Sequence, residues 1–268
     1  MAGVITDDAI WQKVEHFPHL NQADVIVWRF DPVDLHSHSS MFETLLSPHE
    51  KIRLDRFISQ ESRFIFVQCR GVLRLLLARM AKCKLGDVNI KNGNQGKPEL
   101  IFDKSSQPIY FNISHTRNLC LIALSSRYEV GIDVEKTHRI KQLASLARAY
   151  LSPDDMEEWE KGDKKDRQET FFEYWCAKEA ILKALGCGLS IHPSQINLAD
   201  ALVSNPLCGV QEDGSFFEIR EYMLKRIPLS NDFKGWLAVL GIVNRIEFFE
   251  FTPQLLSSIN FSDGRKLE

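Results

Sequence analysis

The chain has 268 residues, of which 44% are hydrophobic and 26% charged, proportions that are ordinary for a soluble globular protein. This length allows one large hydrophobic core or two modest ones. The formal net charge of −3 excludes a global positive field for nucleic acid or membrane surfaces, so any anion site must be a local arrangement of Lys, Arg and backbone amides.

The cysteines and the apolar runs point to a reduced protein without a membrane anchor. Six cysteines are scattered without a CxxC pair, namely Cys69, Cys83, Cys120, Cys176, Cys187 and Cys208. Scattered cysteines in a chain of this size indicate small buried side chains rather than zinc ligands. The first residues do not resemble a signal peptide, and no apolar run reaches the ~20 residues that span a bilayer. We expect a cytoplasmic protein that binds neither nucleic acid nor membranes.

Hydrophobic periodicity predicts a mixture of helices and strands. Strands are predicted at 24–29, 108–124 (strand, turn, strand), 130–135, 216–223, 236–243 and 246–251. Helices are predicted from Pro48 onward and at 61–84, 140–150, 153–161 and 168–185. Loops are predicted at 31–40 and, around a short strand, at 85–96, and the tail 252–268 is expected to be partly disordered.

Two carboxylates share one face of the strand predicted at 130–135. Side chains alternate along a strand, so Asp133 and Glu135 project from one side and Ile132 and Val134 from the other. Ionised carboxylates this close repel one another unless a cation lies between them. Mg²⁺ prefers oxygen ligands of this kind. The alternative is a solvated edge strand with Lys136 as the counter-ion.

The helix predicted at 168–185 carries a second set of charged residues. Glu179 and Lys183 lie one turn apart on the same side, beside an aromatic stripe that includes Trp175. An i,i+4 ion pair on a surface helix, worth about a few tenths of a kcal/mol, also explains this spacing. Gly186 and Gly188 are expected to end the helix and to hold its last turn rigidly.

Two turn-like segments carry groups that can contact a phosphate. The segment 111–116 ends a predicted strand with Asn112, Ser114 and His115, which offer amide, hydroxyl and imidazole donors. The Gly-Lys-Pro segment 96–98 combines close backbone approach, a point charge and a stiff exit. Ordinary turn chemistry explains each of these segments when it is taken alone.

Together, the motifs GKP, FNISH, GIDVEK and FFEYWCAKEAILKALGCGL resemble those of the Sfp-type 4′-phosphopantetheinyl transferases. The likeness extends from about Glu50 to Leu198, and the last two motifs are the specific ones. It implies an α+β (α/β) fold of two similar subdomains related by a pseudo-twofold axis, with coenzyme A bound in the active-site cleft between them. A helix followed by a strand hairpin occurs in both halves of the sequence, which agrees with this fold.

We place the N-terminal subdomain at 1–130, the C-terminal subdomain at 131–251 and a tail at 252–268. By resemblance, the first subdomain faces the adenine and 3′-phosphate of coenzyme A, and the second carries the metal and the catalytic carboxylates. The implied metal ligands are Asp133, Glu135 and Glu179, which would hold Mg²⁺, with Mn²⁺ as a substitute. The implied contacts to coenzyme A are Gly96, Lys97, Pro98, Asn112, Ser114, His115 and Lys183. The candidates for the basic anchor of the 3′-phosphate are Arg56, Arg63 and Arg70.

The resemblance implies transfer of 4′-phosphopantetheine from coenzyme A to a serine of an apo acyl or peptidyl carrier protein, with release of adenosine 3′,5′-bisphosphate. Glu179 would take the serine proton, directly or through water, beside a metal ion held with Asp133. Lys183 and His115 would stabilise the charge that develops on the diphosphate. The carrier, and with it fatty acid or secondary-metabolite biosynthesis, is left open.

A basic helix side offers one surface for an acidic carrier, unless its residues are merely solvated: Arg70, Arg74, Arg79, Lys82 and Lys84. A catalytically silent module that binds coenzyme A or a carrier protein is the alternative function. The sequence has neither the GxxxxGK[ST] of a P-loop kinase nor the GxSxG of a serine hydrolase. A chain that contains both halves can complete its own cleft, so we expect a monomer.

Overall fold

The computed structural model describes residues 11–18, 24–93, 96–101, 108–188, 190–198, 207–210, 216–219 and 221–257. Its strands are β1 (Gln12–Lys13), β2 (Val25–Phe30), β3 (Ile90–Asn92), β4 (Pro98–Leu100), β5 (Tyr110–Thr116), β6 (Leu119–Ser125), β7 (Val130–Lys136), β8 (Leu207–Val210), β9 (Phe216–Ile219), β10 (Met223–Arg226), β11 (Phe233–Val239) and β12 (Ile246–Glu250). Its α-helices are α1 (Ser39–Leu45), α2 (Pro48–Asp55), α3 (Gln60–Ala81), α4 (Leu143–Tyr150), α5 (Pro153–Lys161), α6 (Arg167–Leu185) and α8 (Pro253–Ser257). Short 3-10 helices are η2 (Pro32–His38), η3 (Leu85–Asp87) and η4 (Pro193–Gln195).

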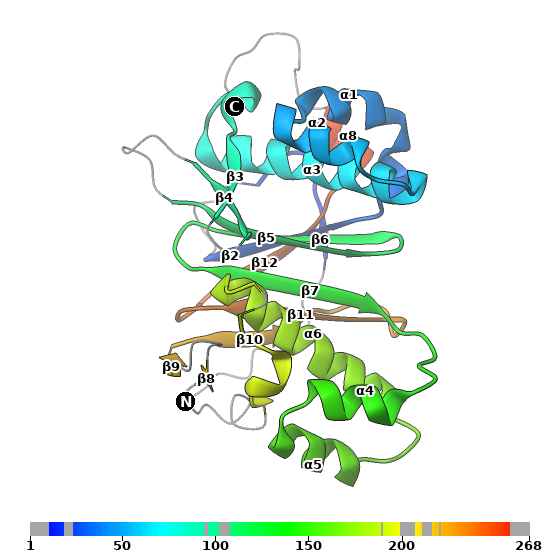
Figure 1. Ribbon diagram of the computed structural model, residues 1–268. Helices are drawn as coiled ribbons and strands as arrows, with labels where there is room; N and C mark the ends of the chain where they lie inside the picture. Colours follow the sequence, from blue (N-terminus) through cyan, green and yellow to red (C-terminus); the bar gives the residue numbers. More distant parts are fainter. Residues whose placement is uncertain are drawn as a thin grey trace.

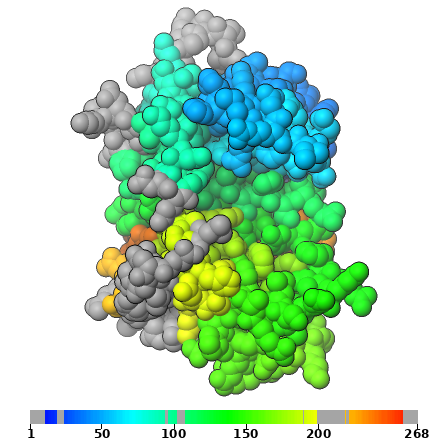
Figure 2. Space-filling model, in the orientation of Figure 1, coloured from blue at the N-terminus to red at the C-terminus, as the bar shows by residue number. Residues whose placement is uncertain are grey.

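Two sheets lie face to face between two layers of helices (Figure 1). The larger sheet has the order β1-β12-β2-β6-β5, and the smaller one has the order β10-β11-β7. Helices α1 to α3 cover the outer side of the larger sheet, while α6 covers the outer side of the smaller sheet and α4 and α5 lie beyond α6. These two groups of helices form opposite ends of the molecule (Figure 2). The arrangement agrees with the predicted α+β class.

Strands β2 and β6 of the larger sheet are almost wholly apolar, and both of their faces are buried. On β2, Val25 and Val27 belong to the core between the two sheets, whereas Ile26 and Trp28 pack in the core beneath α3. Side chains alternate along a strand, so a strand buried on both faces needs a continuous apolar run. This explains why the VIVWRF sequence of β2 shows no alternation of apolar and polar residues.

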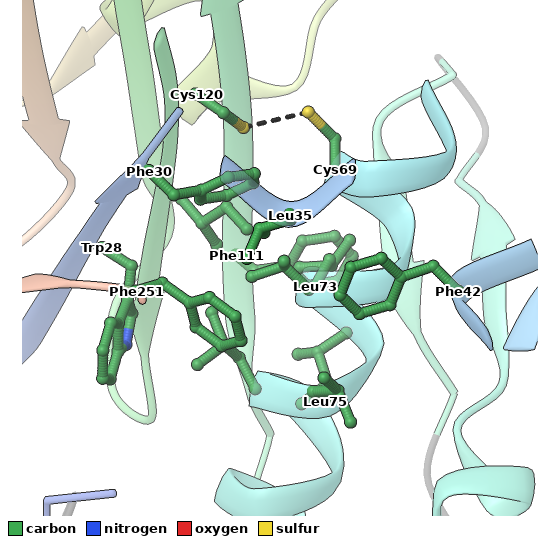
Figure 3. Packing of buried hydrophobic residues seen from close by; sticks show 14 of the residues in the cluster. Trp28, Phe30, Leu35, Phe42, Cys69, Leu73, Leu75, Phe111, Cys120 and Phe251 are labelled. Atoms are coloured by element: carbon green, nitrogen blue, oxygen red, sulfur yellow. Dashed lines mark hydrogen bonds between the residues drawn. The ribbon is translucent and has the colours of Figure 1, made fainter. Parts of the chain in front are cut away.

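The core beneath α3 places two cysteines in contact. Figure 3 shows Cys69 of α3 facing Cys120 of β6, and their sulfur atoms are 3.1 Å apart. Both side chains are buried, and burial is the largest factor that raises the pKa of the Cys120 thiol. The five cysteines whose side chains are described are free thiols. Four of them are buried, as their scattered spacing predicts, and Cys83 is partly exposed.

Most predicted elements are confirmed, but the loop predicted at 31–40 is wrong. That segment forms η2 and the start of α1 because Asp31 accepts the backbone N–H of Val33 at 2.9 Å and Pro32 follows in the first turn. Leu35 and Phe42 then bury their side chains against α3. The predicted strand 216–223 is also two separate strands, β9 and β10.

The end of the chain returns to the N-terminal half. Strand β12 pairs in parallel with β2, so it belongs to the larger sheet although it lies within the predicted C-terminal subdomain. The first part of the predicted tail is ordered, because α8 buries Leu255 and Leu256 in the core beneath α3. Residues 258–268 lie outside the described residues. None of the described helices is both long and apolar enough to span a bilayer.

Candidate active site

The edge strands of the two sheets meet through side chains rather than through backbone pairing. Each of three alternate residues of β5 accepts a backbone N–H of β7: Asn112 from Ile132 at 3.0 Å, Ser114 from Val134 at 3.3 Å and Thr116 from Lys136 at 3.4 Å. A strand edge leaves backbone N–H groups unpaired, and buried N–H groups need acceptors. The polar residues of the FNISHT segment therefore join the two halves of the molecule along β7.

One face of β7 packs against helix α6, while β11 pairs with the edge that lies away from β5. A Cβ atom placed on Gly131 would lie 2.0 Å from the carbonyl oxygen of Ala180 and 2.3 Å from the backbone nitrogen of Ala184, so only glycine lets the two backbones approach this closely. Two residues further along the same face, Asp133 lies beside Lys183 of α6. Close packing at Gly131 thus places the charged residues of α6 against those of β7.

Asp133 is the centre of a buried charge cluster. Its residue is only 4% exposed, and its Oδ1 accepts from the Lys183 ammonium at 2.6 Å and from the Ser114 hydroxyl at 3.0 Å. Lys183 also donates to Ser114 Oγ at 3.2 Å and to the Ile132 carbonyl at 3.3 Å. The second oxygen, Oδ2, is buried without a well-formed hydrogen bond. The Cys176 thiol lies nearby: burial is the largest cause of its raised pKa, and the charge of Asp133 raises that pKa further.

Glu135 shows the electrostatic effect of its neighbour on the same strand face. Burial raises its pKa above the ordinary value, the charge of Asp133 raises it further, and Lys183 partly opposes this. Lys183 therefore balances part of the charge of the two carboxylates at positions 133 and 135, but it does not offset the rise in the Glu135 pKa. Within the described part of the chain, however, no three acidic, His or Cys side chains are gathered as a ready metal site.

Glu179 is held by a tyrosine and lines a cavity. Its Oε1 accepts a short hydrogen bond from the hydroxyl of Tyr150, the last residue of α4. Burial raises the pKa of Tyr150, as does this hydrogen bond, so the phenol remains protonated and donates its proton to the hydrogen bond with Glu179. Glu179 and Lys183 face a cavity of about 450 Å³. The cavity is also lined by Gly96, Lys97, Pro98, Asn112, Ile113, Leu182, Gly186, Gly188, Ile191 and Pro193.

Lys97 joins the Gly-Lys-Pro segment to both walls of this cavity. Its ammonium donates to Glu129 Oε2 at 2.6 Å, to the Val130 carbonyl at 3.2 Å and to the Ala184 carbonyl at 3.0 Å. The last of these is a carbonyl in the final turn of α6, which ends at Gly186 in the left-handed conformation, as predicted. The ammonium of Lys97 is therefore paired with protein oxygens in this structure.

His115 lies on β5 rather than in the turn, because the strand continues through Thr116. The residue as a whole is exposed, but neighbouring atoms remove water from part of the ring. This loss of water lowers the His115 pKa below its ordinary value, and the charge of Lys183 lowers it further. The imidazole is thus neutral at neutral pH and lies within electrostatic reach of Lys183.

The candidate arginines lie in different surroundings. Arg63 donates to the Leu54 carbonyl at 3.0 Å and pairs with Asp55 and Glu43, so it ties helices α1, α2 and α3 together. Arg70 instead lines a second cavity of about 440 Å³, and its Nη1 is buried without a hydrogen-bond partner among the described residues. Burial lowers the pKa of Arg70, while Glu50, 3.8 Å away, opposes this effect.

The basic surface predicted for a carrier protein is wrong at two of its five residues. Arg74 is 3% exposed and donates to Glu50 at 2.6 Å and to the Val88 carbonyl at 2.7 Å. Arg70 is 9% exposed, so neither guanidinium lies on a solvated helix side. Both face Glu50, whose capping interaction at the start of α2 fixes the carboxylate there.

The sequence did not identify Tyr150 or Arg53 as site residues. Tyr150 occupies an ordinary apolar position of a predicted helix, and its proximity to Glu179 arises only from the packing of α4 on α6. Arg53 lines the second cavity with Arg70, and it follows the Pro48 start of α2 without any distinguishing pattern. Arg56, the third candidate for the 3′-phosphate anchor, follows the last turn of α2 and is exposed.

Family models for one kind of protein match most of the chain. The 4′-phosphopantetheinyl transferase superfamily model matches residues 129–236, and a model named 4′-phosphopantetheinyl transferase, N-terminal, matches residues 32–127. The protein slr0495 of Synechocystis sp., provisionally named a 4′-phosphopantetheinyl transferase, is 30% identical over 78% of this chain and 84% of its own length.

Two further relatives carry the same name. The 4′-phosphopantetheinyl transferase HetI of Nostoc sp. is 33% identical over 62% of this chain and 70% of its own length. The 4′-phosphopantetheinyl transferase Sfp of Bacillus subtilis is 26% identical over 56% of this chain and 64% of its own length. The predicted family is thereby confirmed: this chain belongs to the 4′-phosphopantetheinyl transferase superfamily.

Proposed function

We propose that this chain is an enzyme that transfers the 4′-phosphopantetheine moiety of coenzyme A to a serine of an apo carrier protein. The observation that carries the proposal is the shared cavity between the two halves. It brings Glu179 and Lys183 of α6, Asn112 of β5 and the Gly-Lys-Pro segment onto one surface, although these residues are far apart in the sequence. Such a cavity between two lobes is where ligand sites commonly lie.

The reaction is a displacement at phosphorus. The serine oxygen forms a bond to the phosphorus next to the pantetheine arm, and the P–O bond to the second phosphate breaks. Adenosine 3′,5′-bisphosphate leaves with the electron pair. The serine proton needs an acceptor, and Glu179 is the carboxylate that lines the cavity and can take it, directly or through water. No covalent intermediate with the enzyme is needed.

We further propose Mg²⁺, with Mn²⁺ as a substitute, held by Asp133, Glu135 and Glu179. Two features of the chain fit a cation there: the buried Oδ2 of Asp133 lacks a hydrogen-bond partner among the described residues, and the charge of Asp133 adds to the raised pKa of Glu135. Carboxylate oxygens are the donors that Mg²⁺ prefers. When bound, the ion supplies positive charge that stabilises the diphosphate as it accumulates negative charge.

Lys183 would complement that charge as a cation, and the neutral His115 would do so as a hydrogen-bond donor. Lys183 lines the cavity and already holds Asp133, so its ammonium is placed to turn toward a bound diphosphate, and His115 lies near it. Gly96, Lys97 and Pro98 would lie along the adenine, while Asn112 and Ser114 would line the phosphate path beside β7. These are the assignments that the family resemblance implies for matching positions.

For the 3′-phosphate we favour Arg70 over Arg63. Arg70 and Arg53 both line the second cavity. Two planar guanidinium groups beside one cavity suit a phosphate, because each can donate two parallel hydrogen bonds to it. Arg63 uses its donors to bind α1 and α2, so we propose a structural role for it.

Mass spectrometry of carrier proteins tests the activity. The chain, coenzyme A and Mg²⁺ are incubated with a panel of apo acyl and peptidyl carrier proteins, and the intact mass of each carrier is measured. We expect addition of one phosphopantetheine, its loss in Glu179→Gln, and its retention in Glu169→Gln, a change at an exposed position of the same helix. Binding of coenzyme A without transfer to any carrier would instead identify a catalytically silent module.

A further inference from the structure

Tyr150 contacts the carboxylate of Glu179 but is not one of the reacting groups of the proposed transfer. Its hydroxyl donates to Oε1 of Glu179, and the residue is only 8% exposed. We propose that Tyr150 is a positioning residue for Glu179, which fixes one carboxylate oxygen so that the other is free for metal or proton. This inference deepens the proposed function and rests on it.

The ring of Tyr150 is fixed by the same helix that carries Glu179. It stacks on the indole of Trp175 with ring centroids 4.0 Å apart and an interplanar angle of 9°. Phe171 contacts the ring edge-on at 6.3 Å. Trp175 lies one helical turn before Glu179, so the two side chains share a face of α6. The stack therefore directs the phenol hydroxyl toward the carboxylate.

The backbone of Tyr150 is held by the residue next to Glu179. The fully buried ammonium of Lys178 lies 3.5 Å from the Tyr150 carbonyl oxygen and donates to the carbonyl oxygens of Pro193 at 3.0 Å and Ile196 at 2.7 Å. Its ion pair with Asp155 measures 2.7 Å. Adjacent residues of α6 thus contact the two ends of one tyrosine, which makes the end of α4 and Glu179 a single unit.

This arrangement matters because a glutamate side chain is long and flexible. Ordering a free Glu rotamer costs conformational entropy each time a metal ion or substrate binds. A glutamate whose Oε1 is already held, and which lines the cavity, has lost that freedom during folding. Groups that orient a metal-binding side chain through a hydrogen bond commonly contribute about 10–100-fold to metal affinity or activity.

The alternative is that Tyr150 only fills space between α4 and α6. Tyr150→Phe separates the two roles because it removes the hydroxyl and keeps the ring that stacks on Trp175. Tyr174→Phe is the matched control, since Tyr174 lies half-buried on α6, the helix that carries Trp175 and Glu179, and packs in the neighbouring apolar clusters. Both variants lose one phenol oxygen, so a role in packing alone predicts equal effects.

The experiment measures Mn²⁺ affinity by electron paramagnetic resonance, the kcat and KM of transfer, and the melting temperature. For Tyr150→Phe we expect about tenfold weaker Mn²⁺ binding and about tenfold lower kcat, with the KM for coenzyme A within about twofold of the original. Its melting temperature should match that of Tyr174→Phe. Equal Mn²⁺ affinity and kcat in the two variants would overturn the proposal.

A second comparison keeps the test decisive. In the Glu179→Gln background, Tyr150→Phe should cause no further loss of Mn²⁺ affinity, because the carboxylate that the hydroxyl holds is gone. A further tenfold loss there would mean that Tyr150 acts through the rest of the structure. If the original chain transfers nothing to any carrier, the proposed function fails, but the Mn²⁺ titrations still decide the role of Tyr150.

Discussion

Gly131→Ala should test whether the site depends on direct backbone contact between β7 and α6. The added Cβ would lie 2.0 Å from the Ala180 carbonyl oxygen, and Cβ atoms essentially never approach another atom closer than 3.0 Å. The helix and strand must therefore separate by at least about 1 Å at this point, since the obstructing atoms belong to the α6 backbone and cannot rotate away.

The cost of that separation can be estimated. Overpacking a well-packed core costs about 1–3 kcal/mol, and an immovable backbone places Gly131→Ala at the upper end. About 3 kcal/mol corresponds to a fall in melting temperature of roughly 6–12 °C for a chain of this size. Because α6 also carries Glu179 and Lys183, a displacement of about 1 Å should reduce the transfer rate about 100-fold.

The measurement is thermal unfolding followed by calorimetry, together with the carrier-mass assay. Gly86→Ala is the matched control, because a Cβ at Gly86 meets no atom within 4 Å. We expect Gly86→Ala to melt within about 2 °C of the original chain and to remain active. A Gly131→Ala variant that equals Gly86→Ala in both measurements would refute the close packing of α6 on β7.

Three further changes probe how the two halves are held. Lys178→Met should lower the free energy of unfolding by about 3–5 kcal/mol because it removes the ammonium that balances the buried Asp155 charge. Combining it with Asp155→Leu should recover part of that loss in denaturant unfolding. Asn112→Leu should cost about 1–3 kcal/mol in the same measurement, since the buried N–H of Ile132 loses its acceptor. Burial alone would raise the Asp24 pKa, but hydrogen bonds from backbone N–H groups and the charge of Arg127 leave it below its usual 3.8. Asp24→Asn should therefore have a lower free energy of unfolding than the original chain near neutral pH. Calorimetry should show this difference disappear as the pH falls through the lowered Asp24 pKa.

The secondary structure was largely predictable because the periodicity of the chain is strong. The helix 61–84 and the strand 130–135 were predicted within about three residues of their observed ends, and both are set by local patterns. The segment 31–40 was mispredicted because its polar residues hide Leu35, whose burial against α3 decides its structure. Local composition shows no such long-range contact, so tertiary packing overrides it.

The residues of the candidate site were predictable from the sequence, but the hydrogen bonds and ion pairs that join them across different elements were not. The motifs contain Asp133 and Lys183, but their 2.6 Å ion pair depends on the approach of α6 to Gly131. The polar residues of 111–116 were interpreted as phosphate donors, whereas the structure shows Asn112 and Ser114 accepting backbone N–H groups of β7. A contact across the sheets has no signature in the spacing of either segment.

The bonds from β5 and the packing of α6 together hold β7 from two sides, next to the cavity that Glu179 and Lys183 line. β7 is the outer strand of its sheet, so its edge would be free to slide against β5 if only apolar faces met. The three side-chain bonds from β5 fix its register at every second residue, and α6 fixes its other face through Gly131. A one-residue slip would turn Asp133 and Glu135 toward the apolar core between the sheets, where ionised carboxylates are very costly. The same polar residues therefore join the halves and orient the carboxylates, so a site between two subdomains can be as well ordered as one within a single core.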